Sequence, residues 1–278
     1  MIASAALSKR ALNMFGRVFP RCSMIAQAVA FNLFLAFFPT LLIAVGLATS
    51  PIGGRTALFD LITDLTSFLP PGSQQIVSEF LVKRGPEAWK WALVGLGGTL
   101  LAGTQVMKLL MEGIHTIYGD RERPGFFARQ LRALALLVLT IAPLLVAAIL
   151  GVFGRPLRRW LALEFGKGTS VQTWWAIFFH GIAILLAMIA VTVIFRWARP
   201  YEHSLGSVLP GAMIATLLWW AADITFGFYV RKMPYGIIYG GLAAVIGLLI
   251  WMELSTVIIF LGAAWNAERA ESRRTRRP

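Results

Sequence analysis

The chain has 278 residues, of which 58% are hydrophobic even without its 26 glycines, and only 14% are charged. Soluble domains contain roughly 45–50% apolar residues with glycine included, and about 25% charged residues, so a water-soluble globular fold is excluded. The composition also excludes intrinsic disorder, and a single cysteine, Cys22, excludes a disulfide scaffold. We therefore expect an all-α, polytopic membrane protein.

Six stretches are long and apolar enough to cross a bilayer core, which needs about 20 helical residues. Each is continuously apolar and lacks the alternation of a barrel strand, which favours helices. The first stretch is longer than the roughly 7–15 residues of a signal-peptide core, so we expect a retained helix. The six predicted spans are residues 24–48, 91–112, 133–153, 172–195, 208–230 and 238–263.

The segments outside the spans divide the chain into three parts. Residues 1–23 place Leu7, Leu12, Phe15 and Phe19 at a spacing that suits a helix lying on the membrane surface. Residues 24–266 form the expected membrane domain, whose outer loop over 49–90 contains amphipathic helical patterns broken at its centre by two prolines and a glycine. Residues 267–278 form a basic tail.

The basic residues indicate the orientation of the chain. The two terminal segments and the second and fourth connections together carry fifteen Lys and Arg, whereas the other three connections carry ten. Because Lys and Arg accumulate on the cytoplasmic side of a membrane, both termini are expected in the cytoplasm. The net charge of +13 is thereby explained without nucleic acid. The expected partners are the bilayer, anionic lipid at the tail, and a small solute, ion or lipid.

Known enzyme motifs are missing from the sequence. It contains no Walker A, G-x-S-x-G or H-E-x-x-H pattern, and no paired-cysteine metal spacing. The three histidines are far apart, and the acidic residues are scattered singly. We therefore expect no catalytic residue, no metal, no cofactor and no enzymatic activity.

Ionisable side chains inside the spans are the candidate functional residues, because a charge at mid-bilayer costs roughly 3 kcal/mol or more. At about 1.5 Å per residue, Lys108, Glu253 and Asn32 share a layer nearer the cytoplasm. His180 and Asp223 fall in a second layer. We predict that Lys108 pairs with Glu253 and that His180 pairs with Asp223.

A polar stripe on the second span extends the first layer. Gln105, Lys108, Glu112 and His115 recur at helical spacing on one face. The functional interpretation is a pathway for an ion or polar solute, lined by Asn32, Lys108, Glu112, His180, Asp223 and Glu253. The alternative is that each charge only satisfies its neighbours or reaches the headgroups. Small residues at four-residue spacing predict close helix packing at Gly98, Gly103, Gly240 and Gly247.

Four groups of residues occur in a fixed order along the chain. AVAFNLFLAFFP ends at Pro39, and IYGDRERPGFFARQLRAL carries Tyr118, Glu122, Arg123, Arg129 and Arg132. RPYEHSLGSVLPGAMIATLLWW leads into the fifth predicted span with Pro200, Pro210, Gly211, Ala212 and Trp219. The last group comprises Tyr229, Val230, Tyr239, Gly240, Trp251, Gly262, Ala263 and Asn266. This ordered set resembles the YihY/BrkB family of bacterial membrane proteins, also known by the older label ribonuclease BN-like.

The resemblance implies six spans and an inner-membrane location. Two departures matter, because the family's usual Gly-Ala-Glu-x-Asn ending is Gly262-Ala263-Ala264-Trp265-Asn266 here, and Glu253 stands where the family usually has an aromatic or apolar residue. The leading hypothesis is a transporter-like bundle that moves an ion, a small polar solute or a lipid or envelope component. The alternatives are a non-transporting scaffold or lipid-organising protein and, third, a tRNA-processing ribonuclease.

Overall fold

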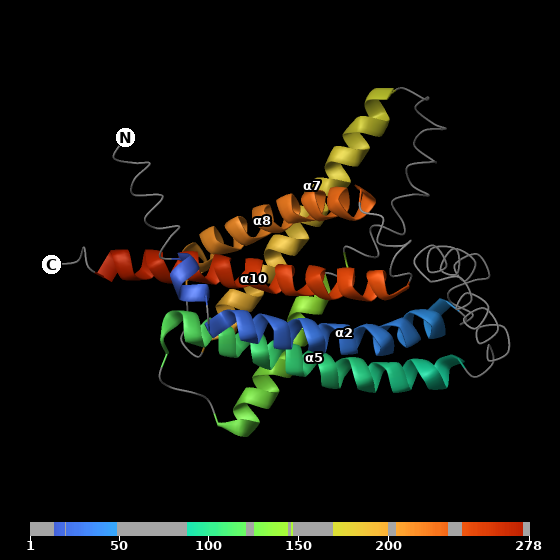
Figure 1. The fold of residues 1–278 in the computed structure, drawn as a ribbon, viewed down its shortest axis with the longest axis horizontal. Coiled ribbons are helices and arrows are strands. Elements are labelled where there is room, and N and C mark those ends of the chain that lie inside the picture. The colour runs from blue at the N-terminus through green and yellow to red at the C-terminus, as the bar shows by residue number, and fades with distance from the viewer. Residues whose placement is uncertain are drawn as a thin grey trace. The chain divides into compact units, whose positions relative to one another are not determined.

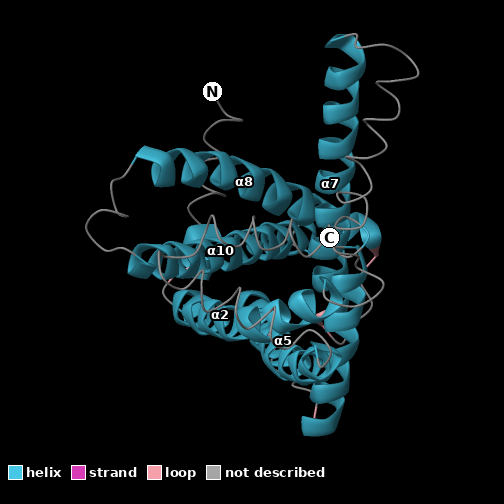
Figure 2. Ribbon diagram, turned by 90° about the vertical axis from the view of Figure 1, so that its right-hand side faces the viewer, coloured by secondary structure: helices cyan, strands magenta, loops and turns pink. Residues whose placement is uncertain are grey.

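The computed structural model describes residues 14–19, 21–48, 88–120, 125–143, 146, 169–199, 204–232 and 241–274. Every regular element within these ranges is a helix, as the uniform helix colour of Figure 2 shows. The expected all-α class is therefore confirmed for the described chain. The predicted outer loop lies outside the described residues up to residue 87, as does Gly240.

Five long helices carry element labels (Figure 1): α2 (Arg21–Ala48), α5 (Ala88–Tyr118), α7 (Thr169–Trp197), α8 (Leu205–Lys232) and α10 (Gly241–Arg274). A further helix, Phe126–Pro143, follows α5. Among the described residues, five helices are long and apolar enough to cross a membrane, and the described apolar part of α7, Gly181–Trp197, is shorter. The chain is thus a multi-span membrane protein, and the sixth span stays a prediction.

Several helix ends differ from the predicted span ends. The third helix begins at Phe126, before the predicted residue 133, and α10 continues to Arg274, beyond the predicted residue 263. Hydropathy locates the apolar part of a helix, but intrahelical hydrogen bonds continue through polar residues outside the lipid. Apolar runs therefore give the number and order of these helices better than their ends.

The chain forms two compact units, which we describe separately. Unit 1 comprises Met1–Met24, Leu110–Ala221 and Val257–Pro278, and unit 2 comprises Ile25–Leu109 and Ala222–Thr256.

In unit 2, α2 and α5 lie in close contact at Pro39. A Cβ atom on Gly95 would lie 2.6 Å from the Pro39 carbonyl oxygen, and one on Gly98 would lie 2.9 Å from the Pro39 Cβ atom. The Thr40 and Thr99 hydroxyl oxygens are 3.2 Å apart across the same contact. Glycine at these positions lets the two backbones approach, as small residues do in membrane helix pairs.

In unit 1, α8 and α10 cross at a similarly close contact. A Cβ atom on Gly262 would lie 2.6 Å from the Gly211 carbonyl oxygen and 2.8 Å from the Ala215 Cβ atom. The buried Asn266 side chain accepts a hydrogen bond from the Gly211 N–H at 2.8 Å and donates one to the Val208 carbonyl at 2.9 Å. These two hydrogen bonds tie α10 to the backbone of α8 on either side of Pro210.

The short helix over residues 14–18 packs on unit 1 through one of its faces. Met14 and Val18 are buried, whereas Phe15 and Phe19 are exposed and stack on each other. Arg17 forms ion pairs with Glu268, at 3.3 Å, and with Glu271 at the end of α10. The described part of the predicted surface segment therefore has one protein-facing side, and its two exposed aromatic side chains are available to the bilayer surface.

Candidate functional site

The C-terminal turn of α5 folds the chain back over the helix. The Gly119 N–H bonds to the Thr116 carbonyl at 3.3 Å, and the Asp120 N–H bonds to the His115 carbonyl at 3.1 Å. These are the two hydrogen bonds of a Schellman C-cap, and Gly119 supplies the left-handed residue that the cap needs, with φ of 69°. The cap places Asp120 beside His115.

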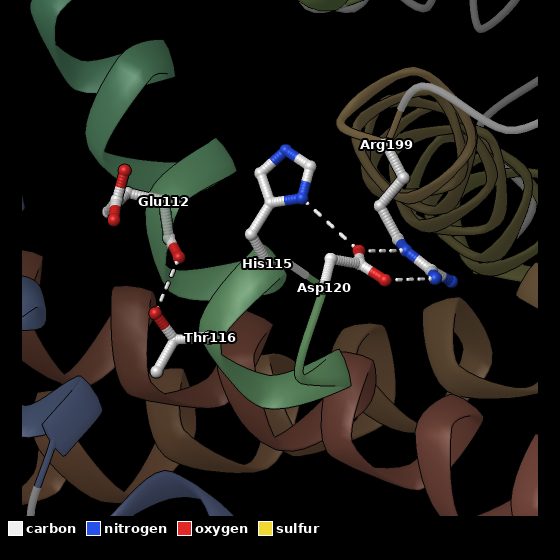
Figure 3. Close-up of polar contacts among 5 residues, drawn as sticks. All are labelled: Glu112, His115, Thr116, Asp120 and Arg199. Carbon is white, nitrogen blue, oxygen red and sulfur yellow. Dashed lines mark hydrogen bonds and ion pairs between the residues drawn. The ribbon is translucent and has the colours of Figure 1, made fainter. Parts of the chain in front are cut away.

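Asp120 is the centre of a buried ionic cluster, which we define as His115, Tyr118, Asp120 and Arg199. Figure 3 shows His115, Asp120 and Arg199. Arg199, which follows the end of α7, donates from Nε to Asp120 Oδ2 at 2.6 Å and from Nη2 to Oδ1 at 2.7 Å. The two side chains are each 11% exposed. The guanidinium also lies over the Tyr118 ring, 3.9 Å from its centroid. The cluster thus joins the ends of α5 and α7.

His115 completes the cluster from within α5. Its Nδ1 atom lies 3.2 Å from Asp120 Oδ2, and the residue is only 6% exposed. Because an ionised carboxylate only accepts hydrogen bonds, the ring nitrogen that faces Asp120, Nδ1, carries a hydrogen. The Nε2 atom on the other side of the ring is buried and has no hydrogen-bond partner.

The electrostatics of Asp120 follow from its partners. Burial alone raises the pKa of this carboxyl group, but hydrogen bonds and charge from Arg199, together with the contact to His115, outweigh burial. The pKa of Asp120 is therefore held below its ordinary value of 3.8. The cluster accordingly holds an ionised carboxylate matched by one guanidinium.

A second ion pair lies one helical turn before His115 on α5. Arg129 of the helix Phe126–Pro143 donates to Glu112 Oε2 at 3.1 Å. Thr116 donates to the Glu112 backbone carbonyl at 2.9 Å, as Figure 3 shows. The predicted pathway residue Glu112 therefore has an arginine partner in unit 1.

The two predicted pathway acids of α8 and α10 lie in unit 2. The Phe226 and Trp251 rings pack with centroids 5.2 Å apart and so align the two helices. Asp223 lies three residues before Phe226, and Glu253 lies two residues after Trp251. The two helices are antiparallel, so going back three residues from Phe226 and forward two residues from Trp251 leads in the same direction, by about 4.5 and 3 Å. The two acids therefore lie at nearly the same level of the helix pair. The predicted assignment of Asp223 and Glu253 to separate layers does not fit this register.

The environments of these acids differ. Asp223 is exposed on α8 and Glu253 is half-buried on α10. Both lie within the membrane-length apolar windows Leu205–Phe228 and Val245–Arg273. An ionised carboxylate in such a window needs water, a ligand or a partner.

The remaining predicted residues are placed as follows. The Asn32 side chain donates to the Ala28 carbonyl of its own helix at 2.8 Å. Lys108 is half-buried, and its pairing with Glu253 stays a prediction. The side chain of His180 lies outside the described residues, so its pairing with Asp223 also stays a prediction. Gly103 is buried, and a Cβ atom on Gly247 would meet Phe226 at 4.0 Å.

The described residues contain no group of three or more His, Cys, Asp or Glu side chains that could hold a metal ion. The chemistry that the ionic cluster offers is hydrogen bonding through His115 and fixed charge through Asp120 and Arg199. A proton or a polar ligand atom can therefore interact with His115 Nε2.

Sequence reasoning missed the central residues of the cluster. Asp120 and Arg199 stand outside the apolar spans, where a search for intramembrane charges does not look. Gly119 directly after a helical pattern is a C-cap signal and could have indicated the turn that positions Asp120. No sequence signal pairs Asp120 with Arg199, because the two residues are far apart in the chain.

Comparisons with known proteins identify a family and several membrane proteins that the chain resembles. The profile of a family described as virulence factor BrkB matches residues 19–278. A Bacillus subtilis (strain 168) protein named "Putative ribonuclease-like protein YfkH" is 31% identical over 175 residues, covering 62% of this chain and 63% of the relative. A UPF0761 membrane protein of Alkalilimnicola ehrlichii is 27% identical over 253 residues, covering 88% of this chain and 54% of the relative.

A further relative, the UPF0761 membrane protein AZOSEA40600 of Aromatoleum aromaticum, is 25% identical over 89% of this chain and 60% of its own length. The chain thus matches between 54% and 63% of the length of these relatives. No solved structure matches the chain.

Proposed function

The chain belongs to the virulence factor BrkB family of multi-span membrane proteins, and from this premise we propose that it moves an ion or a small polar solute across the bacterial inner membrane. A lipid or envelope component is the other cargo that the transport proposal includes. The proposal rests on the polar side chains inside the apolar helices and on no relative's activity.

One observation carries the proposal: Asp223 and Glu253 occur at one level of two adjacent apolar helices. Two carboxylates in this setting are costly unless water, a proton or a cation reaches them. Negative side chains favour a positively charged cargo, so a cation is the ion that fits best.

Transport by purified protein in sealed liposomes tests this proposal. The liposomes contain a pH-sensitive or K⁺-sensitive dye, and an imposed membrane potential drives uptake. We expect uptake above that of empty liposomes, and we expect Glu253→Gln and Asp223→Asn each to lower it by tenfold or more. Glu271→Gln is the matched control, because Glu271 is an exposed acid on the same helix α10 as Glu253.

The other functions predict different results. A scaffold or lipid-organising protein would give no flux, although the protein folds and inserts. The name of the relative YfkH supplies the reason to include RNA as a third arm, in which purified protein is incubated with precursor tRNA. Cleavage by the wild-type protein, without flux, would replace the transport proposal with a nuclease.

A further inference from the structure

The short helix over residues 14–18 lies at the level where α2 and α10 leave the apolar part of the membrane. The candidate span of α2 begins at Cys22, and three residues of chain can place Phe19 at most about 10 Å from it. Arg17 pairs with Glu268 at 3.3 Å, where the long apolar run of α10 ends. Because a headgroup layer is roughly 5–8 Å thick on each side of the core, both helices place the short helix beside the headgroups.

The short helix carries two phenylalanine rings on the side that faces away from the protein. Phe15 is 53% exposed and Phe19 is 44% exposed, and their rings stack with centroids 6.3 Å apart. The other side of the helix, with Met14 and Val18, is buried. Apolar rings are unfavourable in water, whereas the boundary between headgroups and acyl chains removes their surface from water. The two exposed rings at this level therefore fit a lipid surface.

The charges of unit 1 are complementary to an anionic leaflet. Each acidic side chain in the described part of this unit contacts an arginine, since Arg17 pairs with Glu268 and Glu271, Arg129 with Glu112, and Arg199 with Asp120. Further arginines in the same part of the chain have no acidic partner among the described residues: Arg132, Arg196, Arg269 and Arg273. The excess charge is therefore positive, which attracts anionic lipid.

Two of these arginines lie on α10 next to the contact with the short helix. Arg269 is half-buried and Arg273 is exposed, and their four-residue spacing places them on one side of the helix. They follow Glu268 by one and five residues, so they lie within about 8 Å of it along the helix axis. An arginine at this level is placed to bind a phosphate group in a bidentate way.

We propose that this end of unit 1 binds an anionic phospholipid surface. Phe15 and Phe19 insert between the headgroups, and Arg269 and Arg273 bind headgroup phosphates. Arg17 holds the short helix on α10 and keeps Glu268 and Glu271 from facing the leaflet as bare charges. The surface does not depend on the transport proposal, because a scaffold with the same fold would contain it.

Spin labels test the insertion of the two rings in the full chain. Cys22 is the only cysteine, so Phe15→Cys and Phe19→Cys are each made in a Cys22→Ala background and labelled. The proteins are placed in nanodiscs of equal parts phosphatidylglycerol and phosphatidylcholine. We expect collisions with oxygen, which concentrates in lipid, to exceed collisions with a water-soluble nickel complex by about twofold or more. Leu101→Cys, at a 75% exposed site on α5, is the reference for a lipid-facing label.

Spin-labelled lipids test the role of the two arginines. The association of labelled phosphatidylglycerol with the unlabelled protein is compared with that of labelled phosphatidylcholine. We expect the anionic lipid to associate about threefold or more tightly, and we expect the double variant Arg269→Gln/Arg273→Gln to lower this ratio to about half or less. Lys90→Gln is the matched control for loss of a cation, because Lys90 is an exposed cation in unit 2, and it is expected to keep the ratio of the parent.

Three results would overturn the proposal. Greater collision with the nickel complex at both Phe15→Cys and Phe19→Cys would place the rings in water. Equal association of the two lipids, or a ratio that Arg269→Gln/Arg273→Gln leaves unchanged, would remove the anionic lipid. Protection of the two labels that requires added precursor tRNA would assign the surface to RNA instead.

Discussion

At the scale of single residues, Asp120 decides how the ionic cluster is arranged. Its carboxylate accepts two hydrogen bonds from Arg199 and faces His115 Nδ1. Short, charge-assisted bonds in a buried setting are stronger than neutral ones, but they leave a costly charge behind when one partner is removed. The consequences of changing Asp120 therefore concern Arg199 as much as Asp120 itself.

Asp120→Asn is expected to lower the free energy of unfolding by about 3 kcal/mol, because the Arg199 guanidinium loses its counter-charge while buried. Thermal unfolding in detergent, followed by circular dichroism, measures the loss. Glu271→Gln removes an exposed partner of Arg17 and is expected to cost less than about 1 kcal/mol. Equal losses in the two variants would contradict a special role for the buried pair.

The low pKa of Asp120 makes part of the stability depend on pH. A carboxyl group with a folded-state pKa below its ordinary value of 3.8 stabilises the fold above that value. This contribution is lost as the pH falls through the folded-state pKa, because the folded form must then take up a proton. Melting curves between pH 6 and pH 3 should show a steeper acid loss for the wild type than for Asp120→Asn. Equal losses of stability in acid for the two proteins would argue against a lowered pKa of Asp120.

Gly119 is the residue that allows the C-cap. Gly119→Ala is expected to cost about 1 kcal/mol, because an alanine side chain disfavours the left-handed backbone with φ of 69°. Gly97→Ala is the control, since Gly97 lies in α5, the helix that Gly119 caps, with open space where its Cβ atom would be. Thermal unfolding of both variants should show a loss for Gly119→Ala only.

At the scale of elements, the contact of α8 with α10 depends on two glycines and one amide. Gly211 and Gly262 let the backbones meet, and Asn266 bonds the Gly211 N–H and the Val208 carbonyl. The ionic cluster has a different role, because its Asp120–Arg199 pair joins the ends of α5 and α7 through side chains. Backbone contact is sensitive to one added methyl group, whereas the ends of side chains can adjust.

Gly262→Ala is expected to destabilise the fold by about 1–3 kcal/mol, because the added Cβ atom would lie 2.6 Å from the Gly211 carbonyl oxygen. Gly247→Ala on the same helix is the matched control, since its Cβ atom would meet Phe226 at an ordinary 4.0 Å. Thermal unfolding in detergent measures the stability of both variants. A tolerated Gly262→Ala would mean that the helices separate at little cost.

At the scale of the whole molecule, the excess of Lys and Arg predicts the orientation of the chain. Both termini belong to the more basic side, which the positive-inside rule assigns to the cytoplasm. This is a property of the summed connections, and no single arginine decides it.

Fusions at the C-terminus test the orientation. A fluorescent protein that folds only in the cytoplasm should fluoresce when fused after Pro278, whereas alkaline phosphatase, which is active only in the periplasm, should be inactive there. The reverse pair of results would place the tail outside and would invert the predicted topology.

The sequence by itself determined that this protein folds in a lipid bilayer. Long, continuously apolar segments belong in lipid, where their backbone N–H and C=O groups are satisfied within a helix. The all-α class and the order of the helices therefore followed from composition and length. The same reasoning selected Asp223 and Glu253, because a charge inside an apolar run is visible without any partner. It also pointed to Gly98 as a packing position, which lies against Pro39.

Only the tertiary structure decided which residues meet. The level shared by Asp223 and Glu253 depends on the register of α8 against α10, which the Phe226–Trp251 contact sets and hydropathy does not encode. The pairing of Asp120 with Arg199 likewise joins two helix ends 79 residues apart. Apolar runs specify burial in lipid, whereas hydrogen-bond partners depend on distances that arise only when the helices pack.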